Sequence, residues 1–272
     1  MILLKVVEMR EKNTSKISRF GFRLEKVGVH TSRTMMLEDL RLLLSYISSP
    51  DATKSDYLKA IKEDNCLGKR SGKSRKLAAS HLVYLYSLDS SLAVFRSLHY
   101  FWNRDFEGQP IIALLCAYGR DAILRMSAPF ILKFATATTV SRASLEKYLD
   151  VKYPDRFSKS TLKSTAQNLN STWTKSGHLT GKAKKIRSIA KATPGSVAYA
   201  LFLGYLTGIR GESLFTSEYV RLLDCTEDKA MELAEDASRR GWIIFNRVGN
   251  VVEVQFPRIL TAQERGWISD QD

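Results

Sequence analysis

The chain has 272 residues, with 42 Lys plus Arg against 28 Asp plus Glu and a formal net charge of +14. Hydrophobic residues make up 44% and aromatic residues 10% of the sequence, enough for a substantial core, which excludes a disordered basic tail and a low-complexity chain. The longest uncharged runs are shorter than the about 20 apolar residues that a membrane-spanning helix needs, so we expect a soluble protein without a membrane partner.

The positive charge is distributed unevenly along the chain. Residues 156–211 contain 10 Lys and Arg and no acidic residue, whereas residues 212–272 contain 7 basic and 12 acidic residues. A second window without acids, residues 65–88, holds a smaller basic cluster. Because solvated surfaces normally mix charges of both signs, these two windows predict contact with a polyanion.

In chain order, the first unit is predicted to be a helical domain over residues 1–90 that resembles a helix-turn-helix. Thr34 is placed to cap a helix that runs to Ser48, and further helices are expected at about 55–64 and 74–88. The last of these helices is expected to bury Leu77, His81, Tyr84, Leu85 and Leu88.

The segment between the second and third predicted helices combines glycines, hydroxyls and cations at a helix start. Backbone amides and cations in this arrangement suit a phosphate oxygen. Gly68 and Gly72 lack the spacing of a nucleotide-binding P-loop, so the alternatives left are DNA phosphate and a solvated loop without a ligand. The residues predicted to contact nucleic acid here are Lys69, Arg70, Lys73, Arg75 and Lys76.

Residues 91–140 are predicted to form a helical scaffold. Three apolar stretches, residues 92–102, 111–126 and 128–137, have helical spacing. Aromatic side chains in this region could stack on unpaired bases, but core packing is the preferred interpretation. The aromatic residues in question are Phe95, Tyr100, Phe101, Trp102 and Phe106.

Residues 141–195 are predicted to form a basic winged-helix module. Ser141 is placed to cap a helix to about Lys152, and Ser158 a longer helix to Ser176. The longer helix carries a stripe of residues expected to be buried: Leu162, Ala166, Leu169 and Trp173. The short wing that follows contains four cations.

The opposite face of that longer helix is typical of a DNA recognition helix. Hydroxyls and amides can reach base edges, flanking lysines can reach phosphates, and no carboxylate opposes either. The residues predicted to contact nucleic acid are Lys159, Ser160, Lys163, Ser164, Gln167, Asn168 and Lys175 in the helix, and Lys182, Lys184, Lys185 and Arg187 in the wing.

Residues 196–272 are predicted to contain a buried linker helix and a second winged-helix module. Ser217 and Thr226 begin two helices, and a β-hairpin turns at Gly249. Ala230, Leu233, Ala234 and Ala237 form the inward stripe of the second helix, which leaves Asp228, Glu232, Glu235 and Asp236 outward. Because these carboxylates would repel phosphates, this module is predicted to bind protein partners instead of DNA.

The sequence shows no catalytic or cofactor motif. The four histidines lack metal-ligand spacing. Three cysteines, Cys66, Cys116 and Cys225, lie too far apart for a disulfide framework, which indicates a reducing cytoplasm. We therefore expect a cytoplasmic, non-enzymatic protein with no cofactor or metal.

Three stretches carry a resemblance to a known family. They are DNCLGKRSGKSRKL at residues 64–77, FSKSTLKSTAQNL at 157–169 and KSGHL at 175–179. In their order and helix pattern, residues 35–190 resemble the BrxA family of BREX bacterial anti-phage defence clusters. The resemblance implies a small, mostly helical, non-enzymatic protein with winged-helix elements that binds DNA. It supports Lys69, Arg70, Lys73, Arg75, Lys159 and Lys163 as contacts, while the acidic C-terminal module departs from the family pattern.

The sequence as a whole predicts a mainly α fold, a helical scaffold with two or three winged-helix or helix-turn-helix modules and small β-hairpin wings. The leading functional hypothesis is a double-stranded DNA-binding accessory protein with low sequence specificity, which recruits other defence proteins through its acidic end. The alternatives are a sequence-specific transcriptional regulator, an interaction scaffold for an acidic protein, and an RNA-binding protein. Whether the chain forms a homodimer is left open.

Overall fold

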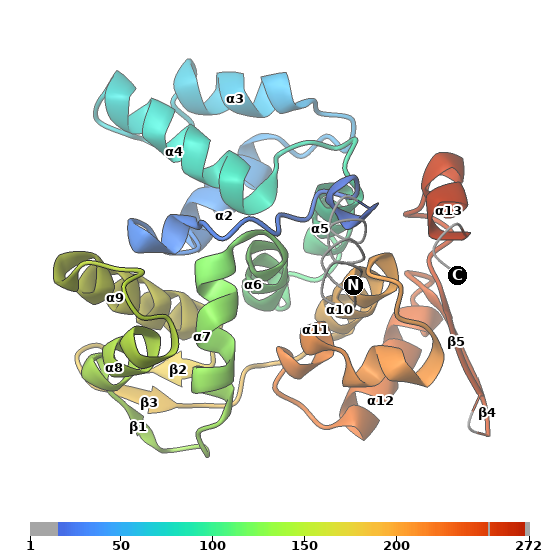
Figure 1. Ribbon diagram of the computed structural model, residues 1–272. Helices are drawn as coiled ribbons and strands as arrows, with labels where there is room; N and C mark the ends of the chain where they lie inside the picture. The colour runs from blue at the N-terminus through green and yellow to red at the C-terminus, as the bar shows by residue number, and fades with distance from the viewer. Residues whose placement is uncertain (1–15, 250, 270–272) are drawn as a thin grey trace, which may run out of the picture.

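The computed structural model describes residues 16–249 and 251–269. Within them the protein is mainly helical with two small antiparallel sheets, which confirms the predicted fold class (Figure 1). The helices are η1 (Val29–Thr31), α2 (Leu37–Tyr46), α3 (Lys54–Lys62), α4 (Gly72–Tyr86), α5 (Ala93–Trp102), α6 (Gln109–Arg120), α7 (Ala122–Leu132), α8 (Arg142–Lys152), α9 (Lys159–Lys175), α10 (Pro194–Leu206), η2 (Gly211–Thr216), α11 (Glu218–Arg221), α12 (Glu227–Arg239) and α13 (Ala262–Ser269). The strands are β1 (Thr139–Val140), β2 (Leu179–Thr180), β3 (Lys185–Arg187), β4 (Ile244–Val248) and β5 (Val251–Gln255).

Helices α6 and α10 form the centre of the core. Both are apolar on every side and buried along nearly their whole length, as a helix of that composition must be. Helix α10 packs against α5, α6 and α12. The predicted core role of the scaffold aromatics is confirmed for Phe95, Phe101 and Trp102, whereas Phe106 is 76% exposed.

Helix α2 begins later than predicted. Its N-cap is Met36 in a left-handed conformation (φ 51°), and Thr34 accepts a hydrogen bond from the Met36 N–H instead of capping the helix. The delay has a tertiary cause, because the Met35 backbone is held at both ends. Its N–H donates to Thr172 Oγ1 (2.9 Å) and its carbonyl accepts from the Tyr86 hydroxyl.

The buried face of helix α4 also differs from the predicted one. Its buried residues are Ala78, Ala79, Leu82, Leu85 and Tyr86, and Leu88 is buried just beyond its end. Leu77 is 43% exposed, while His81 and Tyr84 are half-buried. The prediction is therefore confirmed for Leu85 and Leu88 and wrong for Leu77, and the small alanines that face the core gave no large apolar side chain to signal it.

The C-terminal elements confirm the predicted second winged module in outline. Helices α11 and α12 pack on α10, and β4 pairs with β5 through the predicted hairpin. Ser217 and Thr226 cap α11 and α12 as expected. The strands extend to the turn at Gly249, where Val248 pairs with Val251.

Helix α13 was not predicted, and it brings the two ends of the described chain together. Its Glu264 is buried and lies 2.5 Å from Arg96 on α5. Trp267 packs against Phe20, and its carbonyl accepts a hydrogen bond from Arg19 (2.9 Å). The sequence signal for this helix was the capping pair of Thr261 and Glu264, which hydrogen-bond reciprocally.

Candidate nucleic-acid interface

Residues 122–187 form a complete winged-helix module. The elements follow the order α7, β1, α8, α9, β2, β3, and the sheet has the strand order β1-β3-β2 (Figure 1). Ser141 and Ser158 cap α8 and α9 through hydrogen bonds to backbone N–H groups three residues on, as predicted. Helix α9 thus lies in the place of a recognition helix, followed by a wing between β2 and β3.

Helix α9 has an inward stripe and an exposed face. Ala166, Leu169 and Trp173 are fully buried and Leu162 partly so, which confirms the predicted stripe. The exposed face carries Lys159, Ser160, Lys163 and Gln167. These four residues are available to a partner that approaches α9 from solvent.

A third side of α9 is occupied by the protein itself, which corrects two predicted contacts. Ser164 Oγ donates to the Thr31 carbonyl (3.0 Å), and Asn168 Nδ2 donates to the His30 carbonyl (3.1 Å). Both side chains fix η1 on α9 and do not present free groups to bases. Lys175, near the end of the same side, lies 3.5 Å from Thr34 Oγ1.

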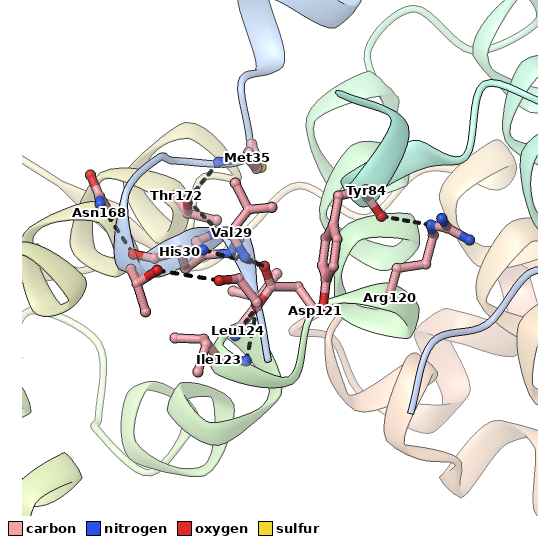
Figure 2. Close-up of polar contacts among 12 residues, drawn as sticks. Val29, His30, Met35, Tyr84, Arg120, Asp121, Ile123, Leu124, Asn168 and Thr172 are labelled. Carbon is pink, nitrogen blue, oxygen red and sulfur yellow. Dashed lines mark hydrogen bonds and ion pairs between the residues drawn. The ribbon is translucent and has the colours of Figure 1, made fainter. Parts of the chain in front are cut away.

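A buried polar network holds η1 between α7 and α9 (Figure 2). His30 Nδ1 lies 3.0 Å from Asp121 Oδ2, and both side chains are fully buried. The Thr172 hydroxyl accepts from the Met35 N–H and lies 3.0 Å from His30 Nε2. The sequence interpretation missed both His30 and Asp121, because their pairing spans 91 positions.

Asp121 joins this network to the start of α7. Its Oδ1 accepts from the N–H groups of Ile123 and Leu124, and its Oδ2 accepts from that of Val29 (2.6 Å). Burial opposes ionisation, but His30 and these N–H groups more than compensate and lower the pKa of Asp121 below its ordinary value. One carboxylate thereby caps α7 and orders the segment that covers α9.

The wing presents two exposed lysines, Lys182 and Lys184. Lys185 is partly buried, and its Nζ donates to the Gly181 carbonyl (2.6 Å). A cavity of about 420 Å³ separates the wing from the helices, and its wall includes Lys182, Lys185, Gln167, Ser171 and Arg142. Arg142, the first residue of α8, is a cation beside the wing that the sequence interpretation missed.

The predicted DNA contact at Arg187 is wrong, because this residue is buried and does not reach toward a DNA backbone. Its side chain is 5% exposed, and the guanidinium donates two hydrogen bonds to Asp224, 2.5 and 2.7 Å long. Next to it, His178 Nε2 lies 3.0 Å from the Leu222 carbonyl. These contacts join the first winged module to the second, so Arg187 orients the two modules.

This junction predicts a loss of stability in acid. Burial lowers the pKa of His178 to about 4, with Arg187 acting in the same direction and Asp224 against it. The folded-state pKa lies below the ordinary value of 6.5, so between pH 6.5 and 4 the unfolded chain binds a proton that the folded protein does not. The contribution of neutral His178 to the free energy of unfolding is therefore fully present above pH 6.5, and about 2–3 kcal/mol is lost as the pH drops toward 4. Urea denaturation at a series of pH values measures this loss. In His178→Gln, which keeps a donor for Leu222, the loss over this range should be absent, and parallel curves for both proteins would contradict the assignment.

The wing turn depends on Gly181. Its φ is +88°, a conformation that side chains disfavour, and a Cβ there would clash with the Lys184 carbonyl oxygen. Gly181→Ala should cost about 1–3 kcal/mol of stability and displace the wing. Thermal unfolding measures the first effect. Gly241→Ala is the matched control, since Gly241 has a similar φ (+69°) but open space around it, and an equal cost in both variants would show that the clash is unimportant.

In the first basic cluster, at residues 69–76, only some of the cations are available to a partner. Lys69 Nζ lies 2.6 Å from Asp39, and Arg75 donates to the Glu63 carbonyl (3.4 Å), so both predicted contacts are engaged within the protein. Ser71 and Ser74 form a reciprocal capping box at the start of α4. The exposed cations of the cluster are Arg70, Lys73 and Lys76.

The structure brings the two predicted basic centres to one cleft. A cavity of about 290 Å³ is lined by Lys69 and Ser74 from the first centre and by Lys175 from α9, together with Arg33. Glu38 and Asp39 also line it, so positive and negative groups are mixed there. The cleft shows that the centres are neighbours, although the exposed cations of each lie outside it.

Helix α12 has the predicted acidic outer face. Ala230, Leu233, Ala234 and Ala237 are buried. Three of the outward carboxylates pair with cations on the same helix, Glu232 with Lys229 and both Glu235 and Asp236 with Arg239. The face remains richer in acids than in bases, which disfavours an approach to phosphates.

Comparisons with known proteins assign no family to this chain. No family model matches it, and no curated protein matches its sequence. In residues 16–249 and 251–269, no three or more His, Cys, Asp or Glu side chains are grouped so that they could hold a metal ion. Over the same residues, no helix is long and apolar enough to span a membrane.

Proposed function

We propose that the protein is a non-enzymatic double-stranded DNA-binding protein that uses its first winged-helix module. The observation that carries this proposal is the exposed surface of α9 and the wing, which presents Lys159, Lys163, Lys182 and Lys184 together with Gln167. No acidic residue occurs anywhere in residues 156–211. A helix flanked by lysines fits the width of the major groove, with the wing on the adjacent backbone.

Low sequence specificity follows from which side chains remain free on α9. Ser164 and Asn168 bind the protein's own backbone, which leaves Gln167 and Ser160 as the exposed groups able to reach base edges. The remaining exposed residues are lysines, which contact phosphates without reading the sequence. Most of the binding energy is therefore expected to be electrostatic.

The resemblance to the BrxA family supports a role as an accessory protein of a BREX-like anti-phage defence system. In this proposal the first winged module holds DNA, and the second recruits protein partners. The carboxylates on the outer face of α12 support that division, because they would repel a DNA backbone. The junction at Arg187 and Asp224 keeps the two modules in a fixed relation.

The salt dependence of binding tests this function. If about four phosphates are neutralised, the affinity for duplex DNA should fall roughly 100-fold between 50 and 200 mM salt, because each contact releases condensed counterions. Fluorescence anisotropy with a labelled duplex measures the slope. An affinity that does not change with salt would overturn the proposal.

A sequence-specific transcriptional regulator is the second candidate. Gln167 favours it, since an exposed amide in the middle of a recognition helix can bind adenine through two hydrogen bonds. Competition with unrelated duplex DNA separates the candidates, because a regulator retains one preferred site while a sequence-tolerant protein is displaced. Duplex RNA in the same assay tests whether the surface distinguishes the two polymers.

A further inference from the structure

The cavity between the wing and helices α8 and α9 is large enough to hold a small molecule. Its volume of about 420 Å³ is within the range of ligand-binding clefts. The residues that line it in the described chain include no Asp or Glu. Its polar lining residues are Arg142, Gln167, Asn170, Ser171, Lys182 and Lys185.

Asn170 lies in the wall of this cavity with a carboxamide that has no partner. The residue is 4% exposed, and its Oδ1 is buried without a hydrogen bond. Within residues 16–249 and 251–269, no group accepts a hydrogen bond from its Nδ2 either. Because buried polar groups are nearly always hydrogen-bonded, an amide left without partners in the wall of a cavity points to a ligand.

The wall also carries positive charge that no acid compensates. Arg142 pairs with Glu146 (2.7 Å), so this cation is already neutralised. Lys185 Nζ donates to the neutral Gly181 carbonyl (2.6 Å), and burial lowers the pKa of Lys185 with no carboxylate acting against it. In the part of the chain that the structure describes, Lys182 pairs with no carboxylate. An anion in the cavity would therefore meet two uncompensated lysines.

The first turn of α8 adds backbone donors to the same wall. Ser141 Oγ accepts from the Ser144 N–H (3.0 Å), whereas the N–H groups of Arg142 and Ala143 have no acceptor among the described residues. Arg142 and Ala143 both line the cavity, and the first turn of α8 contains no acidic residue. Free N–H groups at the positive end of a helix are typical ligands of a phosphate group.

The burial of Asn170 favours a small molecule over a segment of duplex DNA. A duplex that passes over the opening can reach the exposed Lys182 and Gln167, but not a side chain that is 4% exposed. A phosphodiester also offers acceptors alone, so it cannot satisfy the Oδ1 of Asn170. A hydroxyl or amino group of a small molecule can donate to that oxygen.

We propose that this cavity binds a small phosphate monoester, with the phosphate at the first turn of α8 and its polar body against Asn170. Lys182 and Lys185 neutralise the phosphate, and the carboxamide of Asn170 pairs with a hydroxyl or amino group of the ligand. Gln167 and Lys182 belong also to the surface assigned to DNA, so ligand and duplex exclude each other. This competition rests on the proposed function, whereas the binding of the ligand does not.

Titration calorimetry on the full chain without DNA tests the ligand site. The probes are adenosine monophosphate and glucose 6-phosphate, which distinguish a nucleotide from a sugar phosphate as the source of the phosphate group. At least one of them should bind about tenfold more tightly than inorganic phosphate, because the body of the ligand adds hydrogen bonds to Asn170. If inorganic phosphate binds as tightly as both monoesters, or if neither monoester binds, the proposal is wrong.

Lys185→Gln and Lys184→Gln are a matched pair of variants for the charge. Each removes one positive charge from the wing, but Lys185 lines the cavity and Lys184 does not. Lys185→Gln should weaken binding of the monoester about tenfold, and Lys184→Gln less than about twofold. Equal losses in the two variants would show that the charge of the wing, and not the cavity, attracts the ligand.

Asn170→Leu tests the contact to the body of the ligand. Because the carboxamide has no partner in the folded protein, this variant should unfold at the same temperature as the unchanged protein or a higher one. It should lose most of the preference for the monoester over inorganic phosphate. A preference that survives the substitution would contradict the role of Asn170.

Fluorescence anisotropy with a labelled duplex tests the competition separately. A saturating concentration of the monoester that binds should weaken the apparent affinity for the duplex at least about tenfold, since Gln167 and Lys182 are shared. Lys184→Gln should weaken duplex binding and leave monoester binding unchanged. A duplex that stays bound at saturating ligand overturns the competition. A chain that binds the monoester but no duplex overturns the DNA-binding proposal alone.

Discussion

Replacing Lys159 and Lys163 together with glutamate is expected to lower the affinity for duplex DNA by about 100- to 1,000-fold at 100 mM salt. Each lost phosphate contact costs roughly tenfold at this salt concentration, and the new carboxylates add repulsion. Both lysines are exposed on α9, so the helix and its buried stripe are left intact. Anisotropy with a labelled duplex measures the affinity.

The control for this experiment is Lys54→Glu with Lys59→Glu on α3. Both residues are exposed, and the change in net charge is the same, but α3 does not belong to the winged module. The control should change the affinity by less than about fivefold, through the long-range field alone. If both pairs of substitutions weaken binding equally, net charge and not the surface of α9 determines binding.

The salt slope gives a second measurement on the same variants. Loss of two phosphate contacts should reduce the slope of log affinity against log salt by about two. Gln167→Ala should leave the slope unchanged, because an amide releases no counterions. If this substitution weakens binding to one DNA sequence only, the regulator hypothesis gains support. An unchanged slope in the lysine variant would place the phosphate contacts elsewhere.

The elements that were predicted correctly are specified by residues close together in the sequence. Ser141, Ser158 and Thr226 each cap a helix through an N–H group three positions later, so the signal and its partner lie in one short window. The inward stripe of α9 is equally local, since its spacing is fixed by the helix. Such features need no knowledge of the remaining fold.

The predictions that were wrong depend on partners far along the chain. Asn168 binds the carbonyl of His30, 138 positions away, and Arg187 binds Asp224, 37 positions away. In the sequence, Asn168 cannot be distinguished from the neighbouring amide Gln167, nor Arg187 from the neighbouring cation Lys184. Only the packing of η1 and of the second module decides which of these groups stay exposed.

The same distinction explains the basic cluster at residues 69–76. Its composition predicted a phosphate contact, and composition cannot show that Lys69 lies against Asp39 on another helix. The free cations of the cluster, such as Arg70 and Lys73, remain candidates for a peripheral contact. Charge along the sequence therefore located the basic surface, while the fold determined which side chains contribute to it.

Asp121→Ala is expected to destabilise the protein by about 3–5 kcal/mol, the largest effect of any single substitution considered. The substitution removes the acceptor for backbone N–H groups at Val29, Ile123 and Leu124 and leaves His30 buried without its carboxylate. Chemical denaturation measures the loss. Thr226→Ala, which removes an exposed helix cap, is the control and should cost about 1 kcal/mol.

Asp121→Asn separates the contribution of helix capping from that of the negative charge at this position. It also serves as the test if the alanine variant does not fold. Its amide oxygen can still accept at the start of α7, but the negative charge opposite His30 is lost. The pKa of Asp121 is lowered in the folded protein, so its contribution to stability is present above its ordinary pKa of about 4 and disappears as the pH falls below that value. In the asparagine variant, the loss of stability caused by protonation of Asp121 below this pH should therefore be absent.

The Asp121 network also connects stability with DNA binding, although the His30, Asp121 and Thr172 side chains are fully buried. The network holds η1, and η1 holds the side of α9 that contains Asn168 and Thr172. When η1 is released, α9 loses the contacts that fix its position relative to the wing. Asp121→Asn should therefore weaken DNA binding about tenfold while the salt slope stays unchanged, because every phosphate contact is retained. A reduced slope would instead show that the lysines themselves had moved out of reach.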